Sequence, residues 1–211
     1  MFTKIIFSLI ILITIKRYND IETNKQHKVR EIRAVLKDTF QIISLKEAGI
    51  YIDIPEPHET LEENAREKSN TIYKITGKDC FSEDTGLEVA SLNNEPGVKS
   101  ARYAGDDNDF KKNTEKLLQN LQQSANRQAQ FRTVISLMLD GKEYSFEGIC
   151  KGSITENPSG TNGFGYDPVF IPEGSTKTFA EMSMEEKNQY SHRKKATTQF
   201  ASFLNNYDGK N

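Results

Sequence analysis

Acidic side chains in two short stretches of the sequence could bind a metal ion or activate water. In IPEPHETLEENAREKSN, Glu56 lies in the loop before an expected helix cap, where a carboxylate can turn toward a cleft and hold a hard divalent cation. In FSEDTGLEVA, the acidic pair Glu83-Asp84 precedes Thr85 and a glycine. Carboxylates at a strand-to-turn junction could bind Mg²⁺ or activate a water molecule, and an ordinary Asp-Thr-Gly turn is the alternative.

Two further stretches carry groups suited to phosphate. In ETNKQHKVREI, Thr23, Asn24 and Lys28 lie just before or at the start of an expected helix, where unpaired N–H groups and the helix dipole favour an anion. A simple N-cap is the alternative there. The stretch KTFAEMSMEEKNQYSHRKKA places three cations near a capping box and the start of the last helix: Lys187, His192 and Arg193. Cations at a helix start oppose the dipole, so they predict a nearby anion unless they merely decorate the surface.

A glycine-rich loop, NPSGTNGFGYDPVF, presents an aromatic side chain between glycines. Glycines on either side of Phe164 let the backbone approach a ligand closely, and a ring held in this way suits stacking on a flat base. The carboxylates suit a metal ion, and four cations suit a polyphosphate: Lys28, Lys68, Lys187 and Arg193. Together these groups predict a nucleoside triphosphate site.

The composition limits the class of protein that carries these groups. At 211 residues, with 36% hydrophobic and 27% charged residues, the chain has the size of one globular domain or two tightly joined lobes. The formal net charge of -2 provides no global basic field, so nucleic acid is not an expected partner. Cys80 and Cys150 form no CxxC pair, which favours reduced thiols and a cytoplasmic location.

Helical and strand patterns alternate along the chain and predict an α/β fold with a central mixed sheet flanked by helices. Strands are expected over 131–139 and 144–154, joined by a tight Asp140-Gly141 turn. Amphipathic helices are expected over four ranges: 28–38, 60–76, 109–123 and 191–207. The second of these opens with a Thr60-x-x-Glu63 capping box and stops at Gly77.

The N-terminal residues 1–22 are treated apart from residues 23–211, which carry all the motifs above. Residues 5–15 form an apolar run that is too short to span a membrane as a helix, and no small-residue cleavage site follows it. Its many β-branched residues favour a buried parallel strand, with a secretory or membrane segment as the alternative. Membrane association is therefore not expected.

Five motifs, in order and at compatible spacing, resemble the inosine triphosphate pyrophosphatase family. They are TNKQHKVREI, ETLEENAREK, EDTGLEVASLNNEPGVKSARYAG, SGTNGFGYDPVFIPEG and KTFAEMSMEEKNQYSHR. The resemblance implies hydrolysis of ITP, dITP and XTP to the monophosphate and pyrophosphate, which cleanses the nucleotide pool. It also implies a Mg²⁺-dependent homodimer of two-lobed subunits, with the nucleotide in a groove between the lobes.

The resemblance implies a role for each matching residue. Asp84 would activate water and, with Glu56, bind the metal ion, while Thr85 would contact the substrate beside it. The remaining substrate-binding residues, with Phe164 stacked on the purine, would be Thr23, Asn24, Lys25, Lys28, Lys68, Phe164, Gly165, Tyr166, Asp167, Lys187, His192 and Arg193. Asp84 would deprotonate a water molecule that attacks the α-phosphorus, and the cations would stabilise the departing pyrophosphate.

The sequence departs from the family pattern at three places. Lys25 stands where the family has asparagine, and lysine cannot accept a hydrogen bond as an asparagine carbonyl does. Glu83 stands where the family has aspartate, and KRYNDIE separates the apolar run from Thr23. The alternatives are a catalytically impaired nucleotide-binding protein, a Maf-like nucleotide pyrophosphatase, and a membrane-tethered enzyme.

Overall fold

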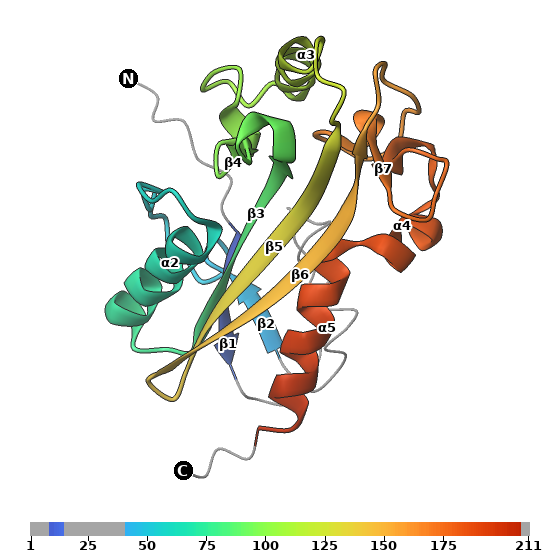
Figure 1. Ribbon diagram of the computed structural model, residues 1–211. Helices are drawn as coiled ribbons and strands as arrows, with labels where there is room; N and C mark the ends of the chain where they lie inside the picture. The colour runs from blue at the N-terminus through green and yellow to red at the C-terminus, as the bar shows by residue number, and fades with distance from the viewer. Residues whose placement is uncertain (1–8, 15–40, 208–211) are drawn as a thin grey trace. The chain divides into compact units, whose positions relative to one another are not determined.

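The structure is a computed structural model that describes residues 9–14 and 41–207, and a seven-stranded sheet runs through it (Figure 1). The strand order is β2-β1-β3-β5-β6-β7, and β4 pairs with β3. The strands are β1 (Leu9–Thr14), β2 (Gln41–Ser44), β3 (Cys80–Val89), β4 (Pro96–Gly97), β5 (Gln128–Leu139), β6 (Lys142–Ile154) and β7 (Phe170–Pro172). The α-helices of the described residues are α2 (Leu61–Thr76), α3 (Phe110–Asn120), α4 (Met184–Tyr190) and α5 (His192–Asn205).

The chain divides into two compact units, which agrees with the two lobes expected from the sequence. The first unit comprises Met1–Asp84, Val134–Glu147 and Ala196–Asn211, and the second comprises Thr85–Thr133 and Gly148–Lys195. The α/β class expected from the sequence is confirmed. The groove expected between the lobes stays a prediction.

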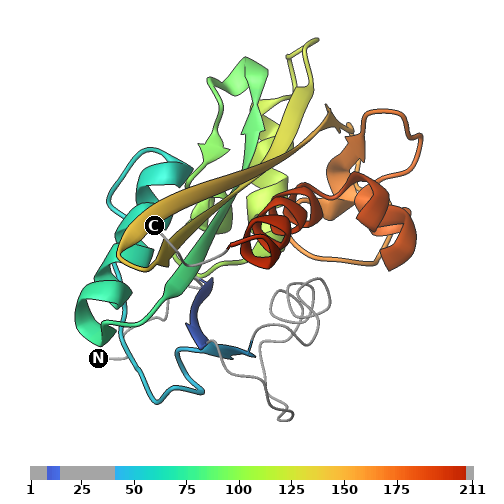
Figure 2. The same cartoon turned by 90° about the horizontal axis from the view of Figure 1, so that it is seen from below.

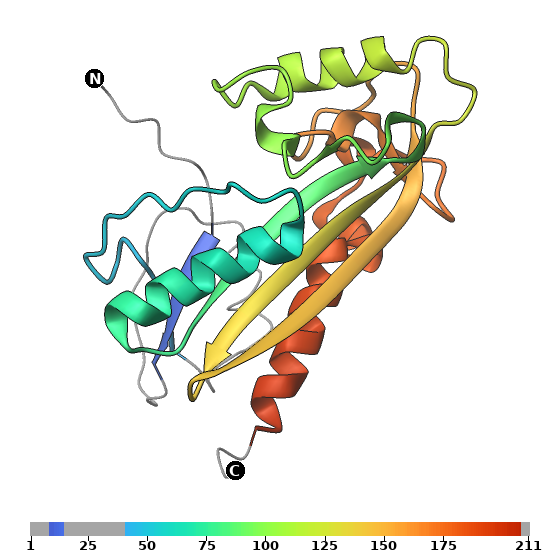
Figure 3. The ribbon, with the colours of Figure 1, turned by 60° about the vertical axis from the view of Figure 1, so that its left-hand side comes forward.

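In the first unit, side chains alternate between the two faces of the sheet, and a different helix covers each face (Figure 3). On one face Phe81, Ile135 and Leu137 pack against Phe200 and its neighbours on α5. On the other face, residues of even number meet α2: the Cys80 thiol donates to the Ser69 carbonyl, and Ser136 shares a hydrogen bond with the Ser69 hydroxyl. Because the period of a strand is two, Asp84 lies on the face that α2 covers.

Helix α2 begins and ends where its sequence predicts. The Thr60 side chain accepts a hydrogen bond from the Glu63 N–H, which satisfies one of the free donors at the helix start. Gly77 adopts the left-handed conformation at the C-terminus, with φ of 63°. The Asp140-Gly141 turn between β5 and β6 has positive φ at both residues, 50° and 75°, as a two-residue hairpin requires.

The N-terminal apolar run forms a strand over Leu9–Thr14, but it does not pair in the direction expected. Strand β1 lies next to β2 (Figure 2). It pairs antiparallel with β2 and with β3, so the prediction of a parallel strand is wrong. The sheet was expected to be mixed; among the described strands, β1 with β2, β1 with β3, β3 with β4 and β6 with β7 pair antiparallel. Periodicity identifies a buried strand but not its direction, because the direction depends on connections between elements.

The second unit has a hydrophobic core that is rich in aromatic residues. It includes Phe131, Phe170 and Phe179, with ring centroids 4.7 Å apart for the first pair and 6.0 Å for Phe131 and Phe179. The Arg127 guanidinium donates to the main-chain carbonyls of Leu121, Ile154 and Thr155. One side chain therefore joins the end of α3 to the end of β6.

Most other elements expected from the sequence are confirmed within the described residues. The expected ranges 131–139, 144–154, 109–123 and 191–207 correspond to β5, β6, α3 and α5, with ends that differ by a few residues. The helix expected over 28–38 lies outside the described residues. Cys80 and Cys150 are free and buried, and burial raises the pKa of the two thiols to about 12 and about 11. Among the described helices, none has the length and apolar character to cross a membrane.

We expect Phe200→Ala to destabilise the protein strongly. The Phe200 side chain is fully buried, and its ring centroid lies 4.7 Å from that of Phe81. Its loss removes apolar contacts and leaves a cavity, so the free energy of unfolding should fall by about 3–5 kcal/mol. Urea denaturation measures this change. Thr198→Ala, at an exposed position of the same helix, should change it by less than about 0.5 kcal/mol; equal effects of the two substitutions would contradict the packing described.

Candidate functional site

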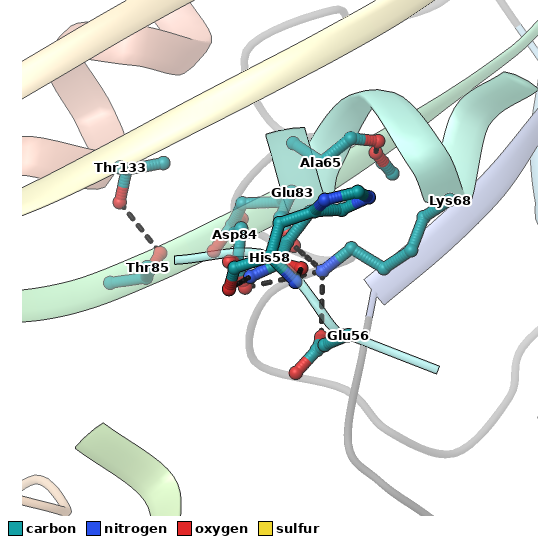
Figure 4. A network of polar contacts seen from close by, with 10 residues as sticks. Glu56, His58, Ala65, Lys68, Glu83, Asp84, Thr85 and Thr133 are labelled. Atoms are coloured by element: carbon teal, nitrogen blue, oxygen red, sulfur yellow. Dashed lines mark hydrogen bonds and ion pairs between the residues drawn. The ribbon is translucent and has the colours of Figure 1, made fainter. Parts of the chain in front are cut away.

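Two carboxylates of the first unit converge on one buried ammonium group (Figure 4). Lys68 Nζ donates to Glu56 Oε1 at 2.9 Å and to Asp84 Oδ1 at 3.1 Å. A third, longer contact of 3.4 Å reaches the main-chain carbonyl of Glu83. The Lys68 side chain has no exposed surface, so its charge is stabilised by these oxygens rather than by water.

Helix and strand geometry explain why these three groups meet. Ala65, Lys68 and Ile72 recur at helical spacing and form the buried face of α2. Ala65 receives a hydrogen bond from the Ser82 hydroxyl, and Lys68 meets the next side chain on that face of β3, which is Asp84. The catalytic acid expected from the sequence therefore lies beside the helix that carries the expected lysine.

The loop that carries Glu56 is fixed to the start of α2. The buried Asn64 side chain donates to the His58 carbonyl at 3.0 Å and accepts from the His58 N–H at 3.1 Å. This pair of hydrogen bonds satisfies both backbone groups of His58. It holds the segment two residues after Glu56 against the same helix that bears Lys68.

The donor atoms of the Lys68 cluster suit a divalent cation. Glu56 and Asp84 each place a carboxylate oxygen on the Lys68 ammonium. Their oxygens are the hard donors that Mg²⁺ prefers, and Mg²⁺ is commonly held by one or two carboxylates plus substrate phosphates. Within residues 9–14 and 41–207, no group of three or more His, Cys, Asp or Glu side chains is arranged to hold a metal by itself. Glu56 and Asp84 are chemically suited to Mg²⁺, and a metal ion held by them stays a prediction.

In the second unit, the hydroxyl groups of Thr85 and Thr133 share a hydrogen bond of 2.8 Å. Thr85 follows Asp84 on β3, and Thr133 lies on β5 and is fully buried. Either oxygen can be the donor in this pair. The contact restricts the rotation of the Thr85 hydroxyl, which the sequence predicts to contact the substrate.

The glycine-rich loop of the second unit is anchored rather than loose. The N–H groups of Thr161 and Asn162 both donate to the Ala180 carbonyl, at 3.2 and 3.0 Å. A Cβ at Gly163, where φ is +79°, would lie 2.0 Å from Asp167 Oδ2. Glycine is required there, because any side chain would displace that carboxylate.

Asp167 organises the contacts around Phe164. Its Oδ2 accepts from the Phe164 N–H at 2.9 Å and from Lys187 Nζ at 2.6 Å. The same ammonium lies 5.5 Å from the centre of the Phe164 ring and 5.1 Å from that of Phe179. Lys187 lies in the last turn of α4, where a cation is compatible with the helix dipole, and not at a helix start as expected. Its charge pairs with Asp167.

The remaining expected ligands of the second unit are largely buried. The Tyr166 hydroxyl donates to the Ser100 carbonyl at 2.9 Å, and burial raises its pKa. The His192 ring stacks on Phe131, with centroids 4.8 Å apart and an interplanar angle of 12°. Arg193 is 6% exposed. These three side chains pack in the interior of the second unit. Their contacts with a substrate stay predictions.

The structure brings the expected residues together in two groups, one in each unit. Glu56, Lys68 and Asp84 meet in the first, and the second contains the neighbours Phe164, Asp167 and Lys187. The expected phosphate-binding residues Thr23, Asn24, Lys25 and Lys28 lie outside the described residues. Gly165, with φ of 62°, is in the left-handed region and has space around it.

Sequence reasoning missed three residues that support these groups. They are Asn64, Thr133 and Phe110, whose ring contacts that of Phe164. Each lies in a helix or strand where its residue type is typical of a surface or core position. Each also contacts a residue from another segment of the chain. Only Asn64 left a signal, as one of the polar residues on the buried face of α2.

Comparison with known proteins agrees with the motifs. The profile of the Ham1 family matches residues 21–203. The chain is 50% identical over 182 residues to the dITP/XTP pyrophosphatase of Flavobacterium johnsoniae, covering 86% of this chain and 95% of the relative. It is 49% identical over 183 residues to the dITP/XTP pyrophosphatase of Porphyromonas gingivalis, covering 86% and 94%.

Solved structures show the same fold. The Staphylococcus aureus Ham1 protein is 40% identical with a TM-score of 0.81, covering 87% of this chain and 95% of that one. A HAM1 protein from Coxiella burnetii is 32% identical with a TM-score of 0.76, covering 88% and 96%. The resemblance to the inosine triphosphate pyrophosphatase family is thereby confirmed, and the chain belongs to the Ham1 family.

Proposed function

We propose that this protein hydrolyses the deaminated purine nucleoside triphosphates ITP, dITP and XTP to the monophosphate and pyrophosphate, and so cleanses the nucleotide pool. The observation that carries the proposal is the convergence of Glu56 and Asp84 on the buried Lys68 ammonium. The names of the relatives, dITP/XTP pyrophosphatase, support the same reaction and substrate class. We further propose, from the motifs, that the enzyme is a cytoplasmic homodimer.

Asp84 and Glu56 are the residues that would hold Mg²⁺, which when bound would neutralise charge on the phosphates. Asp84 accepts a proton from the water molecule that attacks the α-phosphorus, and pyrophosphate leaves. Lys68 fixes both carboxylates in place, so its role is to orient them rather than to bind the outer phosphates directly. Fixed charges of this kind stabilise a transition state without reorganising during the reaction.

The loop around Phe164 is proposed to recognise the base. The Phe164 side chain is 47% exposed on a backbone fixed by Asp167, so its ring is available for stacking. Hypoxanthine and xanthine carry an acceptor at position 6 and a donor at N1, the reverse of adenine. Polar groups of the loop that pair with this pattern would be left unpaired with adenine, at a cost of about 1–3 kcal/mol each.

The proposal is tested by metal-dependent pyrophosphate release from ITP and XTP compared with ATP. We expect a kcat/KM for ITP about 10²- to 10⁴-fold above that for ATP, and no turnover when Mg²⁺ is removed with EDTA. Equal turnover of ITP and ATP would contradict the base preference. Binding of ITP without pyrophosphate release would indicate a nucleotide-binding protein instead.

Asp84→Asn should abolish turnover while the protein stays folded. The asparagine carbonyl can still accept from Lys68 Nζ, but it cannot take the proton of water, and kcat should fall by about 10²–10⁴-fold. Steady-state kinetics at saturating Mg²⁺ measure the loss. Asp53→Asn, at an exposed position before Glu56, should leave kcat unchanged. A variant at Asp84 with more than about a tenth of the original kcat would remove Asp84 from this role.

Lys68→Met should destabilise the protein and make its stability depend on Mg²⁺. The substitution leaves two carboxylates without their buried ammonium, a loss of about 3–5 kcal/mol for pairs of this kind. Because a divalent cation can replace the missing charge, Mg²⁺ should raise the Tm of this variant more than that of the original protein. Thermal denaturation with and without Mg²⁺ measures both effects. Lys74→Met, exposed on the same helix, is the control; a similar Tm for the two variants would contradict the account of Lys68.

A further inference from the structure

Two half-exposed aromatic rings meet at the surface of the second unit. Phe110 and Phe164 are each 47% exposed, and their ring centroids lie 6.0 Å apart at an interplanar angle of 46°. Phe110 is the first residue of α3 and Phe164 lies in the glycine-rich loop, so the contact joins segments far apart in the sequence. Tilted pairs at this distance attract each other beyond the effect of burial alone.

Helix α3 holds Phe110 in a fixed position. The Asp109 side chain caps the helix by accepting from the N–H groups of Lys111 and Lys112, at 2.9 and 3.1 Å. One turn later, the Thr114 hydroxyl lies 2.9 Å from the Phe110 carbonyl and 3.4 Å from the Gly165 carbonyl. The first turn of α3 therefore contacts two adjacent residues of the loop. The Phe110 ring contacts Phe164, and the Thr114 hydroxyl contacts the Gly165 carbonyl.

Phe164, in contrast, is held mainly through its backbone. Gly163 and Gly165 on either side have positive φ, and the Phe164 N–H is fixed by Asp167. These contacts set where the Cβ lies but not how the side chain rotates. Within the described residues, the Phe164 ring contacts the Phe110 ring and the Lys187 ammonium. The orientation of the ring therefore depends on these two neighbours.

We propose that Phe110 is a positioning residue for substrate recognition: it fixes the orientation of the Phe164 ring so that a purine base can stack on it. This inference rests on the proposed function, because it takes the base of a purine nucleoside triphosphate as the ligand of Phe164. A ring that is already oriented loses less rotational freedom when the base binds. Phe110 thus tightens substrate binding without taking part in the chemical step.

The first test separates substrate binding from chemistry. Phe110→Ala should raise the KM for ITP and for XTP by about 2- to 10-fold, the range expected for losing one aromatic pair, while kcat stays within about 2-fold. Phe110→Tyr keeps the ring and should restore the original KM. Ile75→Ala, at a similarly exposed apolar position on α2, is the matched control and should change neither value. An unchanged KM for Phe110→Ala, or a tyrosine variant that resembles the alanine variant, would overturn the proposal.

The second test uses fluorescence and does not depend on turnover. The chain contains no tryptophan, so Phe110→Trp introduces a single tryptophan beside Phe164, whose emission can be followed separately from that of the tyrosines. Titration with the non-hydrolysable α,β-imido analogue of ITP should change its emission in a saturable way, whereas inorganic triphosphate, which lacks a base, should not. No change with the analogue at concentrations that inhibit the enzyme, or the same change with inorganic triphosphate, would overturn the proposal.

The proposed function and the role of Phe110 can be disproved separately. If the unsubstituted protein does not release pyrophosphate from ITP, the proposed function is wrong whatever Phe110 does. If it releases pyrophosphate but KM and fluorescence are insensitive to position 110, the function stands and the role of Phe110 is wrong.

Discussion

The first unit depends on the contact between the buried ammonium of Lys68 and two carboxylates. A lysine with no exposed surface is stable only when oxygen atoms replace its water, and here the oxygens come from a loop, Glu56, and from a strand, Asp84 and the Glu83 carbonyl. The alternation of β3 and the buried face of α2 bring these groups to one point. The same requirement that stabilises the fold therefore brings two carboxylates to one ammonium group, and these are the carboxylates that we propose hold the metal ion.

In the second unit, a comparable constraint acts through Asp167. Its carboxylate occupies the space where a side chain at position 163 would lie, and it binds both the Phe164 N–H and Lys187. Gly163 is therefore needed to leave space for the Asp167 carboxylate, in addition to any role in the approach of a ligand. The glycine-rich loop is fixed through Asp167, and the orientation of the exposed Phe164 ring depends on neighbouring side chains.

Sequence patterns predicted those features that depend only on neighbouring residues, such as helix ends and tight turns. The Thr60 cap, the Gly77 stop and the Asp140-Gly141 turn follow from residue type and spacing, and each is found where expected. The direction of β1 did not follow, because it is set by pairing with β2 and β3. Asn64, Thr133 and Phe110 escaped notice for a related reason: each acts on a segment distant in sequence, and no local pattern records such a contact. The family resemblance predicts which residues contact the substrate but not the residues that hold them in place.

The central claim is that water, activated by Asp84, attacks the α-phosphorus. It is tested most directly by hydrolysing ITP in water enriched in oxygen-18 and analysing the products by mass spectrometry. The account predicts that the label appears in inosine monophosphate and is absent from pyrophosphate. Label in pyrophosphate would mean attack at the β-phosphorus, and release of labelled phosphate would mean attack at the γ-phosphorus; either result would contradict the account.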